Sequence, residues 1–314
     1  MSVQDEHDHC LAAPLLSEAD GACLTDARPT VPRRAFGGRL AALAGFVGFL
    51  PKPSPAANEE RFLVYYSDQA PATALLPYRW LVLDGQHHPP LAPAIAAGAT
   101  VFGYLSAGES ESNRGTYAAA RAAGLLLDEN PNWPGSFYAD VRRPEWHRLV
   151  LEEMVPALLS QGFHGVFLDT LDNPPFLETR EPARFAGMTA AAAELVRSIR
   201  RRFPATKIML NRAYEIHGAV AGVLDAVLAE NVYGGYDFVN RRYRPTSEAD
   251  ARWQLDKLAE LKRVSPAIRT FTLDYWNPDD HAGLRRLYAR QRRNGHLPYV
   301  ATIDLHRIVP EPGR

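Results

Sequence analysis

Eight short apolar runs, separated by stretches of helical composition, constrain the fold of this chain more than any other feature. Runs rich in β-branched and aromatic residues predict strands, and strands that alternate with helices predict a parallel sheet in an α/β protein. The runs are FLVYYS (62–67), WLVLDG (80–85), TVFGYLSAGE (100–109), GVFLDTLD (165–172), KIMLNR (207–212), AVLAENVY (226–233), IRTFTLDYW (268–276) and LPYVATID (297–304).

Helical segments between the runs complete the pattern. Residues 144–161 begin at a proline and stop before Gly162, as helix ends prefer. The other predicted helices are 90–98, 181–203, 247–264 and 279–295. Eight strands with intervening helices in about 250 residues predict a single (β/α)8 TIM barrel domain over residues 59–314. The first two connections are short, so a doubly wound open sheet is the structural alternative, although no glycine-rich phosphate motif follows a strand.

The first 58 residues are predicted to be a disordered leader with a signal-like segment. Arg33, Arg34 and Arg39 precede an apolar run over 40–50, and small residues follow at 54–57. That order is typical of export signals, and the paired arginines suggest the twin-arginine route. The run is about half of the ~20 residues that cross a bilayer, which argues against a stable membrane span. We expect a periplasmic or secreted protein; the alternative is a surface helix in a disordered tail.

Composition limits the chemistry that the chain can perform. The formal net charge is −1, which gives no general attraction to nucleic acid. Both cysteines, Cys10 and Cys23, lie in the leader, so the predicted domain can form no disulfide and no cysteine-ligated metal site. No histidines have metal-ligand spacing, and no cofactor is expected. Carboxylates are therefore the best candidates for catalysis.

Asp169 and Glu230 are the predicted catalytic pair. Each lies at or near the end of an apolar run, where a barrel carries its active site. Strands two apart in a barrel point inward in the same layer, so these acids can face each other across a sugar. Glycoside hydrolysis requires two carboxyl groups, and their separation decides between retention and inversion, which the sequence leaves open. Asp169 could instead cap a helix, but a glutamate inside an apolar run is costly without a function.

Substrate-binding residues are expected at the same strand ends. Acids and amides there can bind sugar hydroxyls and amines, and aromatic faces can stack on sugar rings. For Asp84, Glu109 and Asp274, structural hydrogen bonding is an equal alternative. Trp133 lies in ENPNWPGSFYAD, which we interpret as an irregular loop that exposes an aromatic platform. The predicted substrate-binding residues are Tyr65, Asp84, Tyr104, Glu109, Asp172, Asn211, Tyr233, Asp274, Tyr275 and Trp276.

Four motifs resemble one enzyme family over residues 61–305. VFGYLSAGESESNR, GFHGVFLDTLD, KIMLNRAYE and LDAVLAENVYGGYDF, in this order, are similar to glycoside hydrolase family 114, the endo-α-1,4-polygalactosaminidases. The resemblance implies a (β/α)8 barrel, Asp169 and Glu230 as catalytic acids, and a partly deacetylated galactosamine polymer as substrate. By analogy with barrels whose nucleophile is on strand four, Asp169 would attack and Glu230 would act as acid/base, with retention. The chain reads FHG at 163–165 where the family often has FDG.

The leading hypothesis is an exported, monomeric, endo-acting glycosidase that cuts an amino-sugar exopolysaccharide without a cofactor. Protonated amines would be attracted to the acids at the strand ends. Three alternatives remain open from the sequence: a glycosidase of this fold with another polysaccharide substrate, a non-catalytic carbohydrate-binding barrel, and a metal-dependent aldolase or phosphohydrolase barrel.

Overall fold

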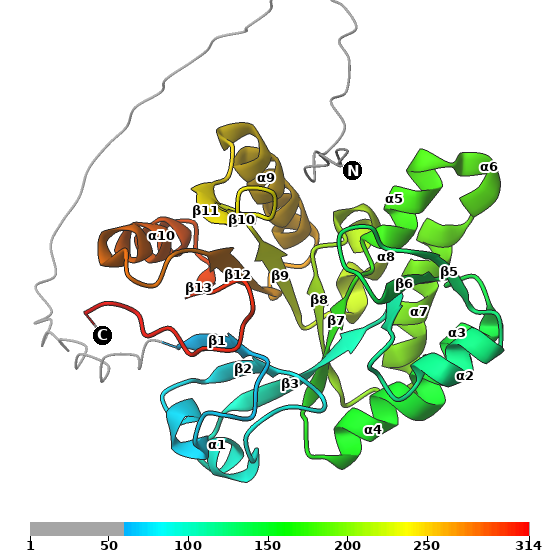
Figure 1. Cartoon of the computed structure of the whole chain (residues 1–314), viewed down its shortest axis with the longest axis horizontal. Helices are drawn as coiled ribbons and strands as arrows, with labels where there is room; N and C mark the ends of the chain where they lie inside the picture. The colour runs from blue at the N-terminus through cyan, green and yellow to red at the C-terminus, as the bar shows by residue number, and fades with distance from the viewer. Residues whose placement is uncertain (1–59, 314) are drawn as a thin grey trace, which may run out of the picture. The chain divides into compact units, whose positions relative to one another are not determined.

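A parallel eight-stranded sheet forms the centre of the part that the computed structural model describes, residues 60–313 (Figure 1). The strand order is that of the chain, and every ladder in the sheet is parallel. The strands are β1 (Phe62–Tyr65), β2 (Trp80–Leu83), β3 (Thr100–Ser106), β7 (Gly165–Asp169), β8 (Lys207–Asn211), β9 (Ala226–Glu230), β12 (Arg269–Tyr275) and β13 (Leu297–Ala301).

The sheet curls into a nearly closed barrel. The first and last strands lie side by side, and Tyr66 N donates to Leu305 O at 2.9 Å just beyond their ends. An open doubly wound sheet would keep these strands apart. The (β/α)8 prediction is therefore confirmed, and all eight predicted runs contain one barrel strand each.

Helices connect the strands, and the longest are those with the clearest sequence signals. Ser247 caps α9 by accepting from Asp250 N, and Asp280 caps α10 by accepting from Gly283 N. The helices are α1 (Ala92–Ala96), α2 (Tyr117–Ala122), α3 (Pro144–Leu149), α4 (Val155–Ser160), α5 (Asn173–Arg180), α6 (Pro182–Phe185), α7 (Met188–Arg202), α8 (His217–Val220), α9 (Glu248–Val264) and α10 (His281–Arg293), with 3-10 turns at Ala72–Leu75, Tyr214–Ile216 and Ala221–Val223.

Two predicted helices differ in detail from the structure. The segment predicted at 144–161 contains a π-helical turn, Val150–Met154, between α3 and α4. Pro156 has no N–H to donate, and the wider turn before it accommodates this loss. The segment predicted at 181–203 is divided into α6 and α7 by Gly187, whose φ of 86° only glycine adopts without strain.

Two small sheets inserted after barrel strands were not predicted. An antiparallel sheet of β4 (Glu109–Glu111), β6 (Ser136–Ala139) and β5 (Leu126–Glu129) follows β3. A hairpin of β10 (Gly234–Asp237) and β11 (Arg242–Pro245) follows β9. The segment interpreted as an irregular loop is in fact the end of β5, a tight turn and β6. Both insertions leave the carboxyl ends of barrel strands, the side on which such barrels carry their active sites.

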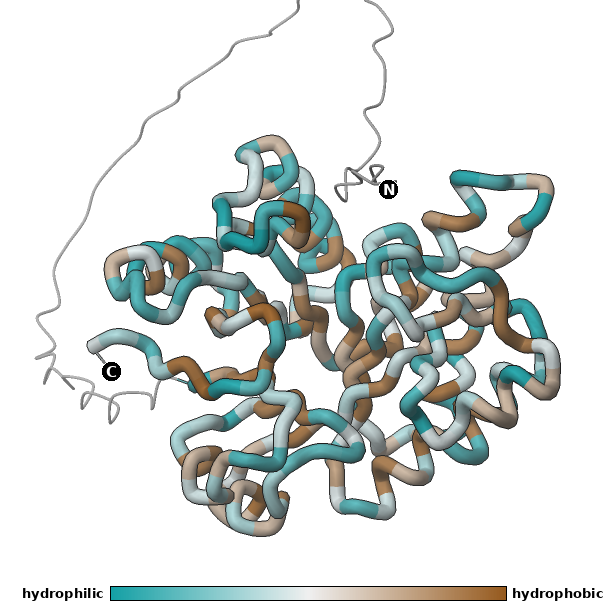
Figure 2. The backbone as a smooth tube through the Cα atoms, viewed as in Figure 1, coloured by the Kyte–Doolittle hydropathy of each residue, from teal (hydrophilic) through white to brown (hydrophobic). Residues whose placement is uncertain are grey.

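The core lies inside the barrel and between its strands and helices. Apolar colouring follows the strands in Figure 2, and the outer helix faces and loops are mainly hydrophilic. Most strand residues are buried on both sides of the sheet, as expected for parallel strands covered by helices. Trp146 on α3 is fully buried, and its Nε1 donates to Ala107 O at 2.9 Å. That bond fixes the backbone directly after β3.

Candidate active site

Three neighbouring strands each end in a polar side chain at the mouth of the barrel. They are Asp169 on β7, Asn211 on β8 and Glu230 on β9. Asn211 Nδ2 donates to Asp169 Oδ1 at 2.7 Å, and the same side chain lies close enough to the Glu230 carboxyl to favour its charged form. Asn211 is 5% exposed, so its amide is fixed between the two acids. The structure thus brings the predicted catalytic pair together through one amide group.

The backbone leaves each of these strands in a strained conformation. Thr170, Arg212 and Asn231, which directly follow the three polar residues, have φ values of 65°, 46° and 56°. Non-glycine residues rarely adopt such positive angles, and each costs about 1 kcal/mol or more. The three strained positions turn the chain away immediately beyond the polar side chains. Strain of this kind often accumulates at functional sites.

The first of these turns is fixed by a contact between β3 and β7. Thr170 Oγ1 accepts from Gly108 N at 2.8 Å and contacts Ser106 Oγ at 3.0 Å. A Cβ atom at position 108 would lie 2.1 Å from Thr170 O, so only glycine fits there. This close approach holds the backbone that follows Asp169.

The two acids have different proton affinities. Burial, followed by repulsion from Asp169, raises the pKa of Glu230 to about 8, although the Arg212 charge opposes the shift. Burial also raises the pKa of Asp169, whose charged form is favoured by the hydrogen bond from Asn211. Below a pH of about 8 Glu230 therefore keeps its proton, and the hydrogen bond from Asn211 favours the charged form of Asp169. Two carboxyls with separated pKa values can divide the roles of acid and base.

Three tyrosines surround the pair. Tyr275 on β12 lies beside Glu230, and Tyr104 on β3 lies beside Asp169 and donates to Glu111 Oε1 at 3.4 Å. The Tyr66 ring packs 5.1 Å from that of Tyr104. Burial, and then the charges of the two acids, raise the pKa of Tyr66 and Tyr275 well above the usual value. These hydroxyls stay protonated and can donate to the acids or to a sugar.

The position of Tyr66 corrects one predicted residue. Tyr65 was predicted to bind substrate, but it is 2% exposed and its hydroxyl accepts from Ala70 N at 2.9 Å. Successive side chains on a strand point to opposite faces, so only one of the two tyrosines can face the acids. That residue is Tyr66.

Two arginines that were not predicted to belong to the site form ion pairs there. Their partners include two acids, Asp84 and Asp172, that were predicted to bind substrate. Arg114 Nη2 contacts Asp84 Oδ2 at 2.7 Å, and Arg114 Nε contacts Glu111 Oε2 at 3.1 Å. Burial would raise the pKa of Asp84, but the bond and charge of Arg114 outweigh it and lower this pKa. Arg212 Nε lies 3.4 Å from Asp172 Oδ2. Arg212 could have been suspected because it directly follows a polar strand end.

Glu109 supports the loops around the site and is not available for substrate. It is 3% exposed and accepts from Asn130 Nδ2 at 2.7 Å, from Asn173 Nδ2 at 2.6 Å and from Ser136 Oγ. Its carboxyl thereby joins the β4–β6 sheet to α5. Structural hydrogen bonding, the alternative expected for Glu109, fits these contacts better than substrate binding does.

Asp274 has a similar internal role. It is fully buried and accepts from Tyr233 N at 2.7 Å, Gly234 N at 2.9 Å and Gln291 Nε2 at 2.6 Å. These bonds fix the turn that follows Glu230 and dock α10 against it. The prediction that Asp274 binds substrate is therefore replaced by a structural role.

Tyr233 and Trp276 face α10 and are also corrected. Tyr233 Oη accepts from Asn294 Nδ2 at 2.6 Å, and Arg290 lies 3.8 Å above its ring. Trp276 Nε1 donates to Asp280 Oδ2 at 2.9 Å. Both aromatic residues line a hollow of about 550 Å³ along α10. Both residues were predicted because they lie at strand ends. The direction of their side chains depends on the turn that follows each strand, which the sequence does not display.

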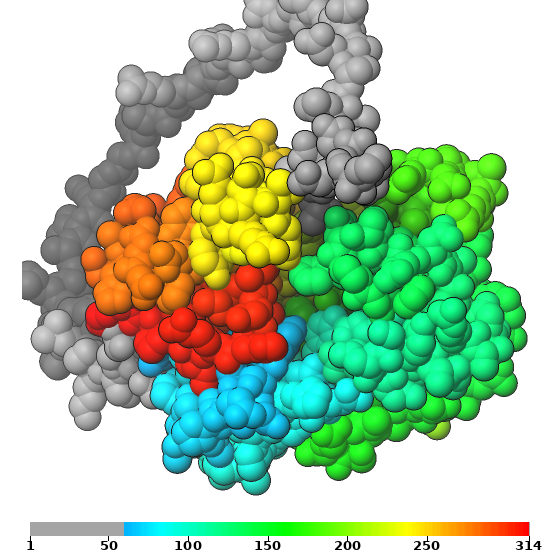
Figure 3. Space-filling model, viewed as in Figure 1, coloured from blue at the N-terminus to red at the C-terminus, as the bar shows by residue number. Residues whose placement is uncertain are grey.

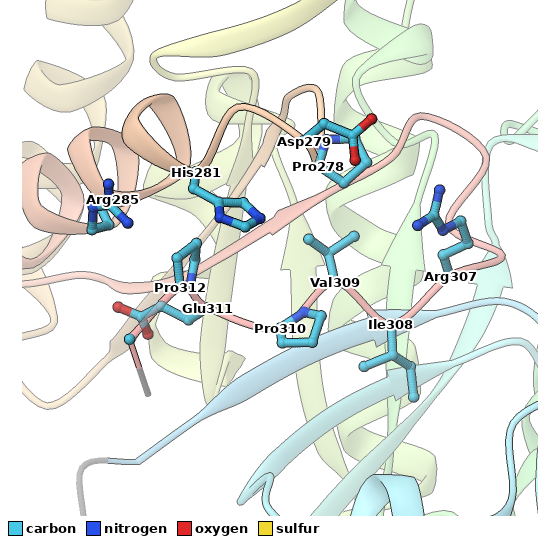
Figure 4. Close-up of a pocket in the computed structure, with 11 residues that line it drawn as sticks. Pro278, Asp279, His281, Arg285, Arg307, Ile308, Val309, Pro310, Glu311 and Pro312 are labelled. Atoms are coloured by element: carbon cyan, nitrogen blue, oxygen red, sulfur yellow. The ribbon is translucent and has the colours of Figure 1, made fainter.

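The surface is hollowed where the segments after β3 and β9 approach the C-terminal segment (Figure 3). A separate hollow of about 560 Å³ lies between the β12–α10 loop and residues 307–313, and it contains none of the predicted site residues (Figure 4). Within residues 60–313, no group of three or more His, Cys, Asp or Glu side chains could hold a metal ion. In the same part of the chain, no helix is both long and apolar enough to cross a membrane.

Solved structures share this fold. The glycoside hydrolase domain of PelA from Pseudomonas aeruginosa is 27% identical, with a TM-score of 0.72 over 80% of this chain and 98% of that one. Ega3 of Aspergillus fumigatus, solved in complex with galactosamine, is 15% identical, with a TM-score of 0.60 over 80% of this chain and 94% of that one. The second likeness concerns the fold alone.

Sequence relatives and a family model agree with these structures. An uncharacterized protein of Deinococcus radiodurans is 29% identical over 69% of this chain and 68% of its own length. One from Methanocaldococcus jannaschii is 33% identical over 66% of this chain and 62% of its own length. The model of glycoside-hydrolase family GH114 matches residues 53–313. With a family match over most of its length and a glycosidase domain of the same fold, this chain belongs to glycoside-hydrolase family GH114 and is a glycoside hydrolase.

Proposed function

We propose that the protein is an endo-acting hydrolase of an exopolysaccharide that contains α-1,4-linked galactosamine, and that Asp169 and Glu230 are its catalytic acids. The observation that carries the proposal is the position of these two acids at the ends of β7 and β9, on either side of Asn211 on β8, whose amide donates to Asp169. The choice of sugar follows the resemblance of the four sequence motifs to the endo-α-1,4-polygalactosaminidases, and the family match supports a glycan substrate.

The proposed reaction retains the anomeric configuration. Protonated Glu230 gives its proton to the glycosidic oxygen while the Asp169 carboxylate attacks the anomeric carbon, so the bond to the leaving sugar breaks as a glycosyl ester forms. Glu230, now ionised, takes a proton from water, and the resulting hydroxide attacks the same carbon and releases Asp169. This sequence requires a protonated acid, which the raised pKa of Glu230 favours, and an ionised nucleophile, whose charge the hydrogen bond from Asn211 Nδ2 to Asp169 Oδ1 stabilises.

The separation of the two carboxyls decides between retention and inversion. Retaining glycosidases separate their carboxyls by about 5–5.5 Å, and inverting ones by about 6.5–9.5 Å to leave room for water. Asn211 lies on the strand between the two acids and interacts with both, which favours the shorter separation.

Asn211 also offers a contact for the substrate. Its Oδ1 is buried and has no hydrogen-bond partner among the residues that the structure describes. Buried acceptors are rarely left unpaired. A sugar hydroxyl or ammonium group at the mouth would supply the missing donor.

The direct test is digestion of defined glycans. Purified protein would be incubated with deacetylated and acetylated α-1,4-galactosamine polymers, with other polysaccharides as comparison, and products would be sized by mass spectrometry. We expect internal cleavage of a galactosamine polymer, with products that keep the α configuration by NMR. Cleavage of another glycan alone would reassign the substrate, and binding without reducing-end release would contradict the proposed activity.

Export is proposed on the sequence alone, because residues 33–57 lie outside the described part of the chain. Paired arginines, an apolar run and small residues occur there in the order of an export signal. Residues 1–58 fused to a reporter should be transported, and changing Arg33 and Arg34 to lysine should block a twin-arginine route. A reporter retained in the cytoplasm with the unchanged segment would refute export.

A further inference from the structure

Two exposed aromatic side chains meet between the insertions that follow β3 and β9. Trp133, in the β5–β6 turn, and Phe238, in the β10–β11 turn, have ring centroids 5.4 Å apart at an interplanar angle of 81°. Trp133 is 50% exposed and Phe238 is 53% exposed. Residues this large and apolar are seldom left half in water at two neighbouring positions unless a surface is to be bound there.

The strand order places this contact on the catalytic side of the barrel. Between β3 and β9 in the sheet lie only β7 and β8, which carry Asp169 and Asn211, and β9 itself carries Glu230. Both insertions start from the carboxyl ends of their strands. Their meeting therefore spans the strand ends that hold the acids, and the two segments approach each other above the hollow in Figure 3.

The Trp133 turn is held rigidly. Asn130 N donates to Ser136 O at 2.8 Å, and Ser136 N donates to Trp133 O at 2.9 Å. The side chains of Asn130 and Ser136, which flank the turn, both donate to buried Glu109. The indole is thus presented by a loop that is ordered before any ligand binds.

The Phe238 turn is held independently. Asp237 accepts from Asn240 N at 2.9 Å and from Asn240 Nδ2 at 2.8 Å, which closes the turn. The Tyr236 ring packs edge-to-face on Phe238 at 5.2 Å and on Tyr243 at 5.1 Å. The hairpin is therefore stiffened by its own aromatic side chains.

An edge-to-face pair still leaves aromatic surface free. One ring directs its edge at one face of the other, so three of the four faces are not covered by the partner ring. The exposed fractions near one half agree with this geometry. Flat, partly apolar faces beside an acid pair suit the apolar faces of sugar rings, and preorganised rings bind with little loss of conformational freedom.

We propose that Trp133 and Phe238 form an aromatic clamp that binds sugar units of the polymer away from the bond being cleaved. The proposal depends on the proposed function, because it names the part of that substrate which these rings contact. The clamp contributes to binding of long chains and makes no contact with the reacting atoms. Short oligomers that fill only the positions next to Asp169 and Glu230 do not reach it.

The test compares Trp133→Ala, Phe238→Ala and the double variant with the unchanged protein on polymer and on short oligomers of galactosamine. We expect KM for the polymer to rise about tenfold in each single variant, since one lost ring contact is worth about 1.4 kcal/mol, whereas kcat and the kinetics on the shortest substrates stay unchanged. Trp133→Phe, which keeps an aromatic face, should restore most of the affinity. Leu76→Ala is the control: Leu76 is another exposed apolar residue, 43% exposed, and it follows Ala72–Leu75 in the connection between β1 and β2, which belongs to neither insertion.

A second readout separates binding from folding. In an Asp169→Asn background, which cannot turn over substrate, tryptophan fluorescence should change on addition of polymer, and Trp133→Phe should remove most of that change. If the unchanged protein is active and every variant has the same KM on polymer, the clamp is overturned but the proposed function is not. An unchanged protein that cleaves no galactosamine polymer would overturn the proposed function, and the clamp with it. Equal losses on polymer and short oligomers would show a structural role and also contradict the clamp.

Discussion

Asp169 is the side chain whose replacement separates chemistry from folding most cleanly. Asparagine keeps its shape and can still bond the Asn211 amide, but it cannot attack an anomeric carbon. We expect Asp169→Asn to lower kcat by at least about a thousandfold while the melting temperature stays within a few degrees. Reducing-end assays and circular dichroism measure the two quantities.

Asp304→Asn is the matched control for that variant. Asp304 follows β13 and accepts from Thr302 Oγ1 at 2.7 Å and His306 N at 3.2 Å, with no contact to the acid pair. Its replacement should leave kcat unchanged. Substantial turnover by Asp169→Asn would transfer the nucleophile's role to another group.

In the proposed mechanism, Glu230 should set the alkaline limb of the pH profile. Its pKa is raised to about 8, so its acid form is present below that pH and is lost above it. We expect kcat/KM to fall tenfold for each further pH unit above this value. Activity that stays constant to pH 10 would exclude Glu230 as the proton donor.

The same shift predicts how Glu230 affects stability. The folded state holds this proton more tightly than the unfolded chain, whose glutamate pKa is near 4.5, so the charged residue costs stability progressively as pH rises from about 4.5 to 8. Glu230→Gln should therefore stabilise the protein by about 3 kcal/mol at pH 7 and have little effect at pH 4. Urea unfolding at both pH values measures this, and destabilisation at pH 7 would contradict it.

Single residues also show what the sequence could and could not predict. Asp169, Asn211 and Glu230 were identifiable because each ends a visible apolar run. Tyr65 was predicted to face the site where the structure places Tyr66, because an error of one residue in the strand register reverses the face to which a side chain points. Arg114 and Arg212 were missed because ion pairing depends on distant segments. His164, which stands in FHG where the family often has FDG, lies at the other end of β7, and its Nδ1 accepts from Val101 N at 3.2 Å.

Among the elements, the barrel strands were predictable and the inserted sheets were not. A buried parallel strand is a continuous apolar run, which a sequence displays directly. Strands β4, β10 and β11 have three or four residues, contain glycine, proline or charge, and depend on their partners for order. The two inserted sheets carry Trp133 on the β5–β6 turn and Phe238 on the β10–β11 turn. Sequence reasoning therefore located the acids better than it located the surfaces around them.

The β4–β6 insertion should depend on Glu109 for its stability. Glu109→Ala leaves three buried or half-buried donors, on Asn130, Ser136 and Asn173, without their acceptor. We expect a loss of about 2–4 kcal/mol in the free energy of unfolding. Glu129→Ala on the same insertion is the control, because its one bond, to Gly135 N, is exposed and should cost less than about 1 kcal/mol. Equal losses in the two variants would remove the anchoring role of Glu109.

Across the molecule, the attraction of the mouth for a cationic polymer is weaker than the sequence suggested. Six acids were expected to face substrate, but Asp84 and Asp172 contact arginines, whereas Glu109 and Asp274 are buried in internal hydrogen bonds. Protonated Glu230 adds no charge at neutral pH. Asp169 is the acid of this group with neither an arginine partner nor a fully internal role. The chain's formal charge of −1 adds no general field.

Salt should therefore affect binding only modestly. A protonated galactosamine polymer feels the Asp169 carboxylate and the partly exposed Asp172, and salt screens exposed charges beyond about 10 Å at 0.1 M. We expect KM for deacetylated polymer to rise about twofold to fivefold between about 0.05 and 0.5 M salt, with kcat unchanged. Fully acetylated polymer, which has no ammonium groups, serves as the matched control and should show no change. A rise of a hundredfold would mean that the paired acids are released to bind substrate, whereas a flat response for both polymers would show that recognition depends on hydrogen bonds and aromatic contacts and not on charge.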